Sequence, residues 1–230
     1  MKKIGLVGGM GPASTVEYYF GLIKKTRETF GDEEYPKIVI DSVNINAVTE
    51  CLRLSHWDLC ADLMVRSVND LAKAGAQVAA LTANTVHIAF DEMEDRFEIP
   101  VVSIVDAVAD EILKMKYQKV LILGTAFTMN SKMYDEALMR LGVAAVLPSE
   151  DEKAQVNAMI NSDLENGIII PGNKAKMISI IEKYSRSKAI DSVLLGCTEL
   201  PLLIKPEDIS VPIVNSTQIH IDALFRAANE

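Results

Sequence analysis

The chain of 230 residues carries one arrangement of apolar segments and turns twice, and this repeat limits the fold more than any single motif does. Residues 80–85 and 194–199 are apolar segments that end in a small or polar turn, and they start 114 residues apart (194 − 80). Residues 4–9 and 119–124 form a second matching pair, which starts 115 residues apart (119 − 4). The nearly equal offsets predict two half-chains built on one α/β plan.

Along the whole chain, apolar runs typical of strands alternate with amphipathic stretches typical of helices. This alternation indicates parallel sheets covered by helices. We therefore expect an α/β fold of two pseudo-symmetric lobes, each a parallel sheet flanked by helices, with the site in the cleft between them. Glu98-Ile99-Pro100 marks the break, so the expected lobes are residues 1–99 plus 209–230 and residues 100–208.

Composition excludes several classes of partner. No apolar run approaches the length of a membrane span, and the odd count of three cysteines gives no disulfide framework, which favours a reducing cytoplasmic location. The formal net charge of −9 opposes binding to nucleic acid, because no local basic patch offsets it. An anionic substrate would have to be held by local hydrogen-bond donors.

Helix signals are clear at several points. Ser14 to Glu17 has the pattern of a capping box before a helix that reaches Phe30, and Ser149 to Glu152 has the same pattern. A long helix from about residue 57 to 74 ends at Gly75, whereas a variable-looking loop is expected around residues 44–53.

Cys197 lies where an apolar segment meets a polar turn, just before an expected short helix. Free backbone N–H groups and the positive end of a helix dipole stabilise a thiolate at such a point, which could then act as a base or nucleophile. The alternative is packing, since free cysteine is among the most buried residue types. The polar turn favours function for Cys197, whereas Cys51 and Cys60 lack such a setting and are expected to pack.

Other candidates each have two interpretations. Asn84, Thr85 and Thr198 could donate hydrogen bonds to a carboxylate, or could simply cap local turns. Gly9 could let the backbone approach a ligand, or could only form the tight turn before the first helix. Arg53 could clamp a distal carboxylate, although a lone arginine is more often a solvated charge.

Two further classes of site are disfavoured. His87 and His220 each stand alone, without metal-ligand spacing, so we expect interior histidines and no metal. The loop after the first apolar segment is a weak dinucleotide fingerprint, because Ser14 occupies the third glycine position and Pro12 lacks the N–H that a pyrophosphate would need.

Four motifs together resemble the cofactor-independent aspartate/glutamate racemase family, and the match spans nearly the whole chain. They are Gly8-Gly9-Met10-Gly11-Pro12, Asn84-Thr85-Val86-His87, Leu123-Gly124-Thr125 with Thr128, and Gly196-Cys197-Thr198-Glu199. The sequence looks most similar to aspartate racemases and L-aspartate/glutamate-specific racemases. The resemblance implies two pseudo-symmetric lobes, a homodimer, an acidic amino acid as substrate, and α-proton transfer between two cysteines without pyridoxal phosphate or another cofactor.

The resemblance also implies roles for individual residues. Cys197 would be one acid/base, Asn84, Thr85 and Thr198 would hold the α-carboxylate, and Gly9, Met10, Thr125 and Thr128 would line the pocket. Where many members of the family carry the other cysteine, this chain has Ala83. A methyl group cannot transfer a proton, so only Thr82, Thr85 or a water could donate on that face, and racemisation is expected to be impaired or one-sided.

Two alternatives remain open at this point. A single-cysteine enzyme of the same superfamily, such as a malonate-type decarboxylase or a maleate isomerase, needs only one thiol. A non-catalytic protein could instead bind an amino acid or dicarboxylate through the donors that remain.

Overall fold

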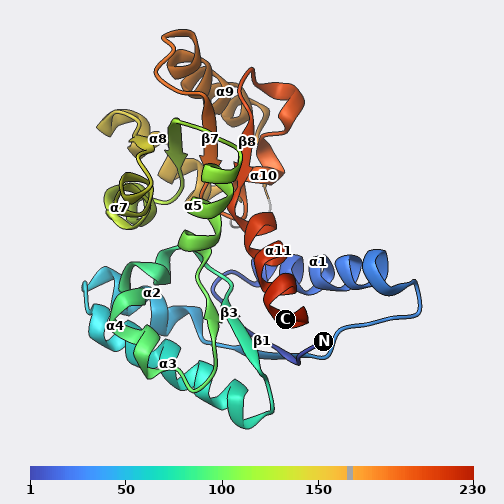
Figure 1. Ribbon diagram of the computed structural model, residues 1–230. Coiled ribbons are helices and arrows are strands. Elements are labelled where there is room, and N and C mark those ends of the chain that lie inside the picture. The colour runs from blue at the N-terminus through green and yellow to red at the C-terminus, as the bar shows by residue number, and fades with distance from the viewer. Residues whose placement is uncertain (165–167) are drawn as a thin grey trace. The chain divides into compact units, whose positions relative to one another are not determined.

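A computed structural model describes residues 1–164 and 168–230 of the chain. It divides into two compact units (Figure 1). Unit 1 comprises Met1–Ile104 and His220–Glu230, and unit 2 comprises Val105–Ile219. Both units are α/β and contain a four-stranded parallel sheet, as the repeat predicted.

The divisions fall later in the chain than the sequence analysis placed them. Residues Val101–Val102 form β4, which pairs with β3 (Val78–Leu81) in the first sheet, so the chain completes that sheet after Pro100. Residues Ile213–Asn215 form β8, which pairs with β7 (Ser192–Leu195) in the second sheet. Strands of two and three residues carry too little pattern to reveal which sheet they join.

Unit 1 has the strand order β2-β1-β3-β4. Its elements are β1 (Ile4–Gly8), α1 (Pro12–Phe30), β2 (Ile38–Ser42), α2 (Ile45–Arg53), α3 (Trp57–Lys73), β3, η1 (Thr85–Ala89), α4 (Phe90–Met93), η2 (Glu94–Arg96), β4, and the His220–Asn229 part of α11 (Ser216–Asn229). Alternation along β1 directs Leu6 to a cluster with Tyr18 of α1 and Ile221 of α11, and Val7 to a cluster with Met64 of α3. Helices therefore cover both faces of the sheet (Figure 1).

Unit 2 has the strand order β6-β5-β7-β8. Its elements are α5 (Ile104–Lys114, which begins at the last residue of unit 1), β5 (Lys119–Leu123), α6 (Ala126–Asn130), α7 (Met133–Arg140), β6 (Ala144–Val146), α8 (Glu150–Ser162), α9 (Pro171–Arg186), β7, α10 (Leu200–Leu203), η4 (Pro206–Asp208), β8, and the Ser216–Ile219 part of α11. Leu123 and Leu195 on the sheet pack with Ile160 of α8 and Ile181 of α9 in one buried cluster.

Two local predictions were wrong. Residues 45–53 form helix α2, whose first turn is capped by the Asn44 side chain accepting from the Asn46 N–H at 2.9 Å. Helix α1 begins at Pro12, since proline is preorganised for the first helical position and needs no N–H partner there. Ser14 is therefore not a cap but lies inside the helix, and its hydroxyl donates to the carbonyl oxygen of Thr82 at 2.8 Å.

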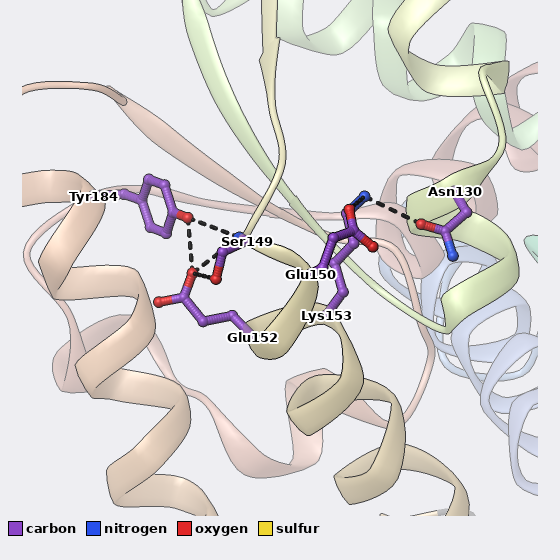
Figure 2. Close-up of polar contacts among 6 residues, drawn as sticks. All are labelled: Asn130, Ser149, Glu150, Glu152, Lys153 and Tyr184. Carbon is purple, nitrogen blue, oxygen red and sulfur yellow. Dashed lines mark hydrogen bonds and ion pairs between the residues drawn. The ribbon is translucent and has the colours of Figure 1, made fainter.

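The capping pair predicted at the start of α8 is present and joins three helices of unit 2. Figure 2 shows the backbone N–H of Ser149 and the hydroxyl of Tyr184 from α9 directed at one carboxylate oxygen of Glu152, at 3.0 and 2.8 Å. On the other side, Lys153 donates to Asn130 at the end of α6, at 3.1 Å. This network holds α6, which directly follows β5, against α8 and α9.

Within the described ranges, 1–164 and 168–230, no helix is both long and apolar enough to cross a membrane.

Candidate active site

The positions of Ala83 and Cys197 are equivalent in the two sheets. In each sheet, the third strand along the unit's sequence pairs with the first, Leu81 opposite Val7 and Leu195 opposite Leu123. Ala83 and Cys197 each follow the end of that third strand by two residues. Carboxyl ends of parallel strands are where α/β proteins bind ligands, so each position is a candidate for chemistry.

The Cys197 thiol contacts a carboxylate in its own turn. Its Sγ lies 2.9 Å from Oε2 of Glu199, and the hydroxyl of Thr198 donates to the same oxygen at 2.7 Å. All three side chains are nearly buried, with 8% of Cys197, 9% of Thr198 and 7% of Glu199 exposed. The thiol therefore has a proton acceptor within direct reach in an environment that contains little water.

The helix after Cys197 does not provide the dipole that the sequence suggested. Helix α10 has only four residues, Leu200–Leu203, and Glu199 stands at its N-cap. A macrodipole needs several aligned peptide units, so one turn contributes little. The Glu199 carboxylate, in contact with Sγ, is a group with chemical consequence for the thiol.

Two glycines allow the strand ends of unit 2 to approach closely. A Cβ atom on Gly124 would lie 3.0 Å from the Gly196 carbonyl oxygen, and one on Gly196 would lie 3.1 Å from the Leu123 carbonyl oxygen. The Gly196 N–H donates to that Leu123 oxygen at 2.7 Å. This fixes the residue immediately before Cys197 against β5.

Thr125 and Thr128 are both engaged at the start of α6. Thr125 Oγ1 accepts from the Thr128 N–H at 3.3 Å and lies 3.2 Å from the Thr128 hydroxyl. The Ala126 N–H donates to Asn157 of α8 at 2.7 Å. These contacts show a capped turn that α8 supports, beside the end of β5.

At the end of β3, the residues around Ala83 are held by the backbone of unit 1. The Thr82 hydroxyl is completely buried and donates to the Val7 carbonyl oxygen at 3.0 Å. Asn84 is also buried, whereas Ala83 and Thr85 are half-buried. Thr82 is thus poorly suited to give its proton to a ligand.

The structure brings His87 and His220 together, although the sequence suggested two isolated histidines. Their ring centroids lie 6.0 Å apart and the rings are nearly perpendicular. Both are interior and hydrogen-bonded, as expected, and burial lowers the pKa of His87 to about 4 and that of His220 to about 3. The sequence could not reveal the pair, because the two residues lie 133 positions apart (220 − 87).

Gly9 has a structural requirement of its own. Its φ of +83° is in the left-handed region, and a Cβ atom there would lie 2.4 Å from the Val43 carbonyl oxygen. Its N–H donates to Thr15 Oγ1 at 3.0 Å. The neighbouring Met10 is half-buried and packs against the cluster between α3 and the sheet.

Arg53 is an exposed residue in the last turn of α2. Its guanidinium makes two hydrogen bonds to the Glu50 carboxylate, at 2.8 and 3.0 Å. Both side chains are more than half exposed, so the pair is worth little energetically. This geometry matches a solvated charge better than a clamp for a substrate.

The other two cysteines belong to unit 1. Cys60 is completely buried, which raises the pKa of its thiol to about 11. Cys51 is half-buried and lines a groove of about 660 Å³ between α2 and α3. No residue that ends a strand lines this groove, and the Arg96 guanidinium on its rim is paired with Asp62 at 2.5 Å.

Glu199 is the functional candidate that the sequence analysis did not single out. Its signal was present, since it closes the Gly-Cys-Thr-Glu motif, but the alternating pattern gave no indication that its side chain turns back towards the thiol. In the part of the chain that the structure describes, no three His, Cys, Asp or Glu side chains are grouped as a metal site would require.

Comparisons with known proteins agree with this architecture. The sequence model of the family described as Asp/Glu/Hydantoin racemase matches residues 7–224. The broad specificity amino-acid racemase RacX of Bacillus subtilis is 25% identical over 217 residues, which cover 93% of this chain and 92% of RacX. A glutamate racemase of Hydrogenobaculum is 28% identical over 190 residues, or 77% of this chain and 68% of that protein.

A solved structure from Pyrococcus horikoshii OT3, described as an aspartate racemase homologue, is similar over the full length of both chains. It is 40% identical in sequence and superposes with a TM-score of 0.88. The two units, their parallel sheets and the turn that carries Cys197 thus occur in a chain that belongs to the Asp/Glu/hydantoin racemase family of isomerases.

Proposed function

We propose that this protein is a cofactor-independent racemase of an acidic amino acid and that Cys197 transfers the α-proton. The observation that carries the proposal is the thiol of Cys197 at the end of β7, 2.9 Å from the Glu199 carboxylate. A thiol is nucleophilic and basic only as the thiolate, so a group that accepts its proton is needed. Glu199 supplies that acceptor.

The proton transfer then has a defined balance. The thiolate of Cys197 takes the α-proton, so the C–H bond breaks, an S–H bond forms, and the electron pair remains on the α-carbon and the adjoining carboxylate. Return of that proton from Cys197 restores the original enantiomer, whereas a proton delivered to the opposite face inverts it. Inversion therefore needs a second donor.

We assign that second position to residue 83, which is equivalent to Cys197 in the sheet topology. Ala83 has no transferable proton, and the Thr82 hydroxyl already donates to Val7 at 3.0 Å. Thr85 or a water would have to serve. Because a hydroxyl is far less readily ionised than a thiol, removal of an α-proton on this face is expected to be slow. The proposed enzyme exchanges one enantiomer faster than it racemises either.

The proposed substrate contacts follow the family resemblance. Asn84, Thr85 and Thr198 are assigned to the α-carboxylate, while Gly9, Met10, Thr125 and Thr128 are assigned to the pocket wall. Arg53 is the weakest of the proposed contacts, because Glu50 already binds its guanidinium. We further propose that the protein acts as a homodimer in the cytoplasm, which light scattering and cell fractionation would test.

Incubation with D- and L-aspartate and with D- and L-glutamate in deuterated water tests the proposal, with ¹H NMR to follow the α-proton and chiral chromatography to follow inversion. Faster loss of the α-proton from one enantiomer, with slow inversion, is the expected result. Equal exchange from both enantiomers contradicts the assignment of residue 83 as the position where the second acid/base is absent.

The same experiment separates the two other classes of function. Loss of carbon dioxide from a malonate-type acid, or isomerisation of maleate, would identify a single-cysteine relative. Saturable binding without exchange of any α-proton would identify a binding protein.

A further inference from the structure

Two sets of buried polar contacts lie side by side in unit 1, with the rings of His220 and His87 6.0 Å apart. The Tyr18 hydroxyl lies 2.6 Å from Nδ1 of His220, and Nε2 of His220 lies 2.8 Å from the Val102 carbonyl oxygen. His87 makes the second set, with Nδ1 2.9 Å from the Ala83 carbonyl oxygen and Nε2 3.3 Å from the Ile104 amide nitrogen. The proposed chemistry uses neither histidine.

The backbone partners fix three of the four ring nitrogens. A carbonyl oxygen can only accept, so Nδ1 of His87 and Nε2 of His220 must carry protons. The Ile104 N–H can only donate, so Nε2 of His87 must be unprotonated and that ring is neutral. The Tyr18 hydroxyl opposite Nδ1 of His220 can donate or accept, and burial, which lowers the pKa of His220 to about 3, makes this ring neutral as well. The two imidazoles are then opposite tautomers.

Each ring bonds to a backbone group of a secondary-structure element. Ile104 is the first residue of α5, and the first N–H groups of a helix have no partner within the helix. His87 therefore caps α5 from outside the helix. Val102 lies in β4 in register with Ala80 of β3, so His220 adds a side-chain contact to a carbonyl oxygen of the sheet.

The contacts also occur where the chain leaves and re-enters unit 1. Ile104 is the last residue of the first segment of unit 1, and His220 is the first residue of the second segment. Phe90 stacks on His87 with ring centroids 5.3 Å apart, and both histidines are almost completely buried. Packing and hydrogen bonding thus hold both rings in one position.

We propose that His87 and His220 are positioning residues, a pair of neutral imidazoles that holds the turn at residue 83, the Ile104 amide and strand β4 in place within unit 1. His87 sets the turn directly, because its Nδ1–H holds the main-chain carbonyl of residue 83. A contribution to proton transfer rests on the proposed function, whereas the hydrogen bonds that the two histidines make are a property of the fold.

The unaltered protein provides the first test. In ¹⁵N-labelled protein, NMR of the imidazole nitrogens is expected to show His87 protonated at Nδ1 and His220 protonated at Nε2, with neither ring titrating between about pH 7.5 and 5. The exposed His56 provides a reference imidazole in the same spectra. Titration of His87 or His220 within that range, or identical tautomers, overturns the proposal.

Two variants separate the bonds of His87. The side-chain amide of His87→Asn can occupy the place of Nδ1 and donate to Ala83, but it is too short to accept from Ile104. The longer His87→Gln can accept from Ile104 and loses the bond to Ala83. We expect hydrogen exchange of the Ile104 amide to accelerate about tenfold in H87N and to stay near the wild-type rate in H87Q. The matched controls are H56N and H56Q, in which the Ile104 amide should exchange at the wild-type rate.

The catalytic consequence is measured in the Ala83→Cys background. There, H87Q is expected to lower kcat for racemisation about tenfold with little change in KM, while H87N retains most of kcat. Equal effects of the two variants on both readouts would show a role in packing alone. If the Ala83→Cys protein does not racemise, the proposed function fails. The tautomers and the Ile104 exchange still test the positioning role of the two histidines.

Discussion

The ends of β3 and β7 occupy the same place in two sheets of the same order, yet they carry different chemistry. At the end of β7, the titratable side chains Cys197 and Glu199 contact each other at 2.9 Å. At the end of β3, Ala83 has no titratable atom, and its main-chain carbonyl is held by His87 at 2.9 Å. One repeat thus carries two titratable side chains in contact, whereas the other has a main-chain carbonyl bound by a histidine.

The comparison shows that topology and reactivity are separate properties of the fold. Repetition of strand order supplies two equivalent turns, but only side chains decide whether a turn can exchange protons. It also shows two ways of stabilising a unit, since unit 1 buries neutral imidazoles while unit 2 ties α8 to its neighbours with the ionised Glu152.

Removal of the reactive thiol is expected to have the largest effect. Cys197→Ser should lower α-proton exchange by a factor of ~10²–10⁴, because a positioned acid/base contributes about that much. Exchange is measured by ¹H NMR in deuterated water. The control is Cys51→Ser, which changes a half-buried thiol on α2 and should leave the rate unaltered. Unchanged exchange in C197S would remove the chemical distinction between the two turns.

Restoring a thiol to the other turn should erase the difference. Ala83→Cys is expected to raise inversion of the slow enantiomer by up to about 10²–10⁴-fold, because the proposed mechanism requires a second ionisable group at this position. Chiral chromatography follows the product. Ala83→Ser is the matched control of similar size, and its hydroxyl should give little gain. A gain of equal size from serine would argue that bulk, and not ionisation, is missing.

Acidification tests the neutral imidazoles of unit 1. Burial lowers the pKa of His87 to about 4 and of His220 to about 3, from the ordinary 6.5, and His87 lowers that of His220 further. As the pH falls below 6.5, the unfolded chain binds protons that the folded chain does not. Stability should therefore decrease by about 1.4 kcal/mol per pH unit for each histidine, down to the folded pKa.

Urea unfolding at several pH values between about 7.5 and 4.5 measures this slope. Among the described residues, the titratable group hydrogen-bonded to the pair is the Tyr18 hydroxyl, 2.6 Å from Nδ1 of His220. A stability that does not change with pH over this interval would contradict the buried neutral pair.

The charged network of unit 2 should respond in a lower pH window. Burial alone would raise the pKa of Glu152, but hydrogen bonds from Lys183, Tyr184 and Ser149 together lower it to about 2, from 4.5. Its stabilising effect is complete above pH 4.5 and is lost as the pH falls towards 2. Glu152→Gln should cost about 1–3 kcal/mol at neutral pH, and less in acid.

Unfolding of Glu152→Gln in urea at neutral and acidic pH provides the measurement. Glu150→Gln is the matched control, since that carboxylate is 84% exposed and its pair with Lys153 should be worth less than about 1 kcal/mol. Equal losses in the two variants would place the stabilisation in general charge balance, not in the Glu152 network.

The smallest effect is expected at Thr217 in α11. In the described portion of the chain, its Oγ1 is the one buried side-chain polar atom that has no hydrogen-bond partner. Thr217→Val should leave stability unchanged or raise it by up to about 1 kcal/mol, because no bond is lost. The neighbouring Ser216→Ala is the contrast, since that hydroxyl donates to Leu195 at 2.8 Å and its loss should cost about 1 kcal/mol. Thermal unfolding measures both.

Periodic features were predictable from the sequence, and features that depend on distant parts of the chain were not. The repeated α/β plan, α3 with Gly75 at its end, and the Ser149–Glu152 cap all follow from local pattern. The edge strand Val101–Val102 was too short to reveal its sheet.

The candidate site was predictable in the same uneven way. The turn with Cys197 was evident because a polar motif follows an apolar strand. The contact with Glu199 was not, since it depends on the rotamer of a side chain two residues further on. The pair of His87 with His220 joins residues 133 positions apart (220 − 87), and no local pattern encodes such a meeting.

His87 forms its hydrogen bond with the main-chain carbonyl oxygen of residue 83, an atom that every amino acid possesses. Alanine, serine, threonine or cysteine could each stand there without disturbing the imidazole. A lineage could therefore discard or regain a reactive group at this point through a few codon changes, while the surrounding architecture stays intact.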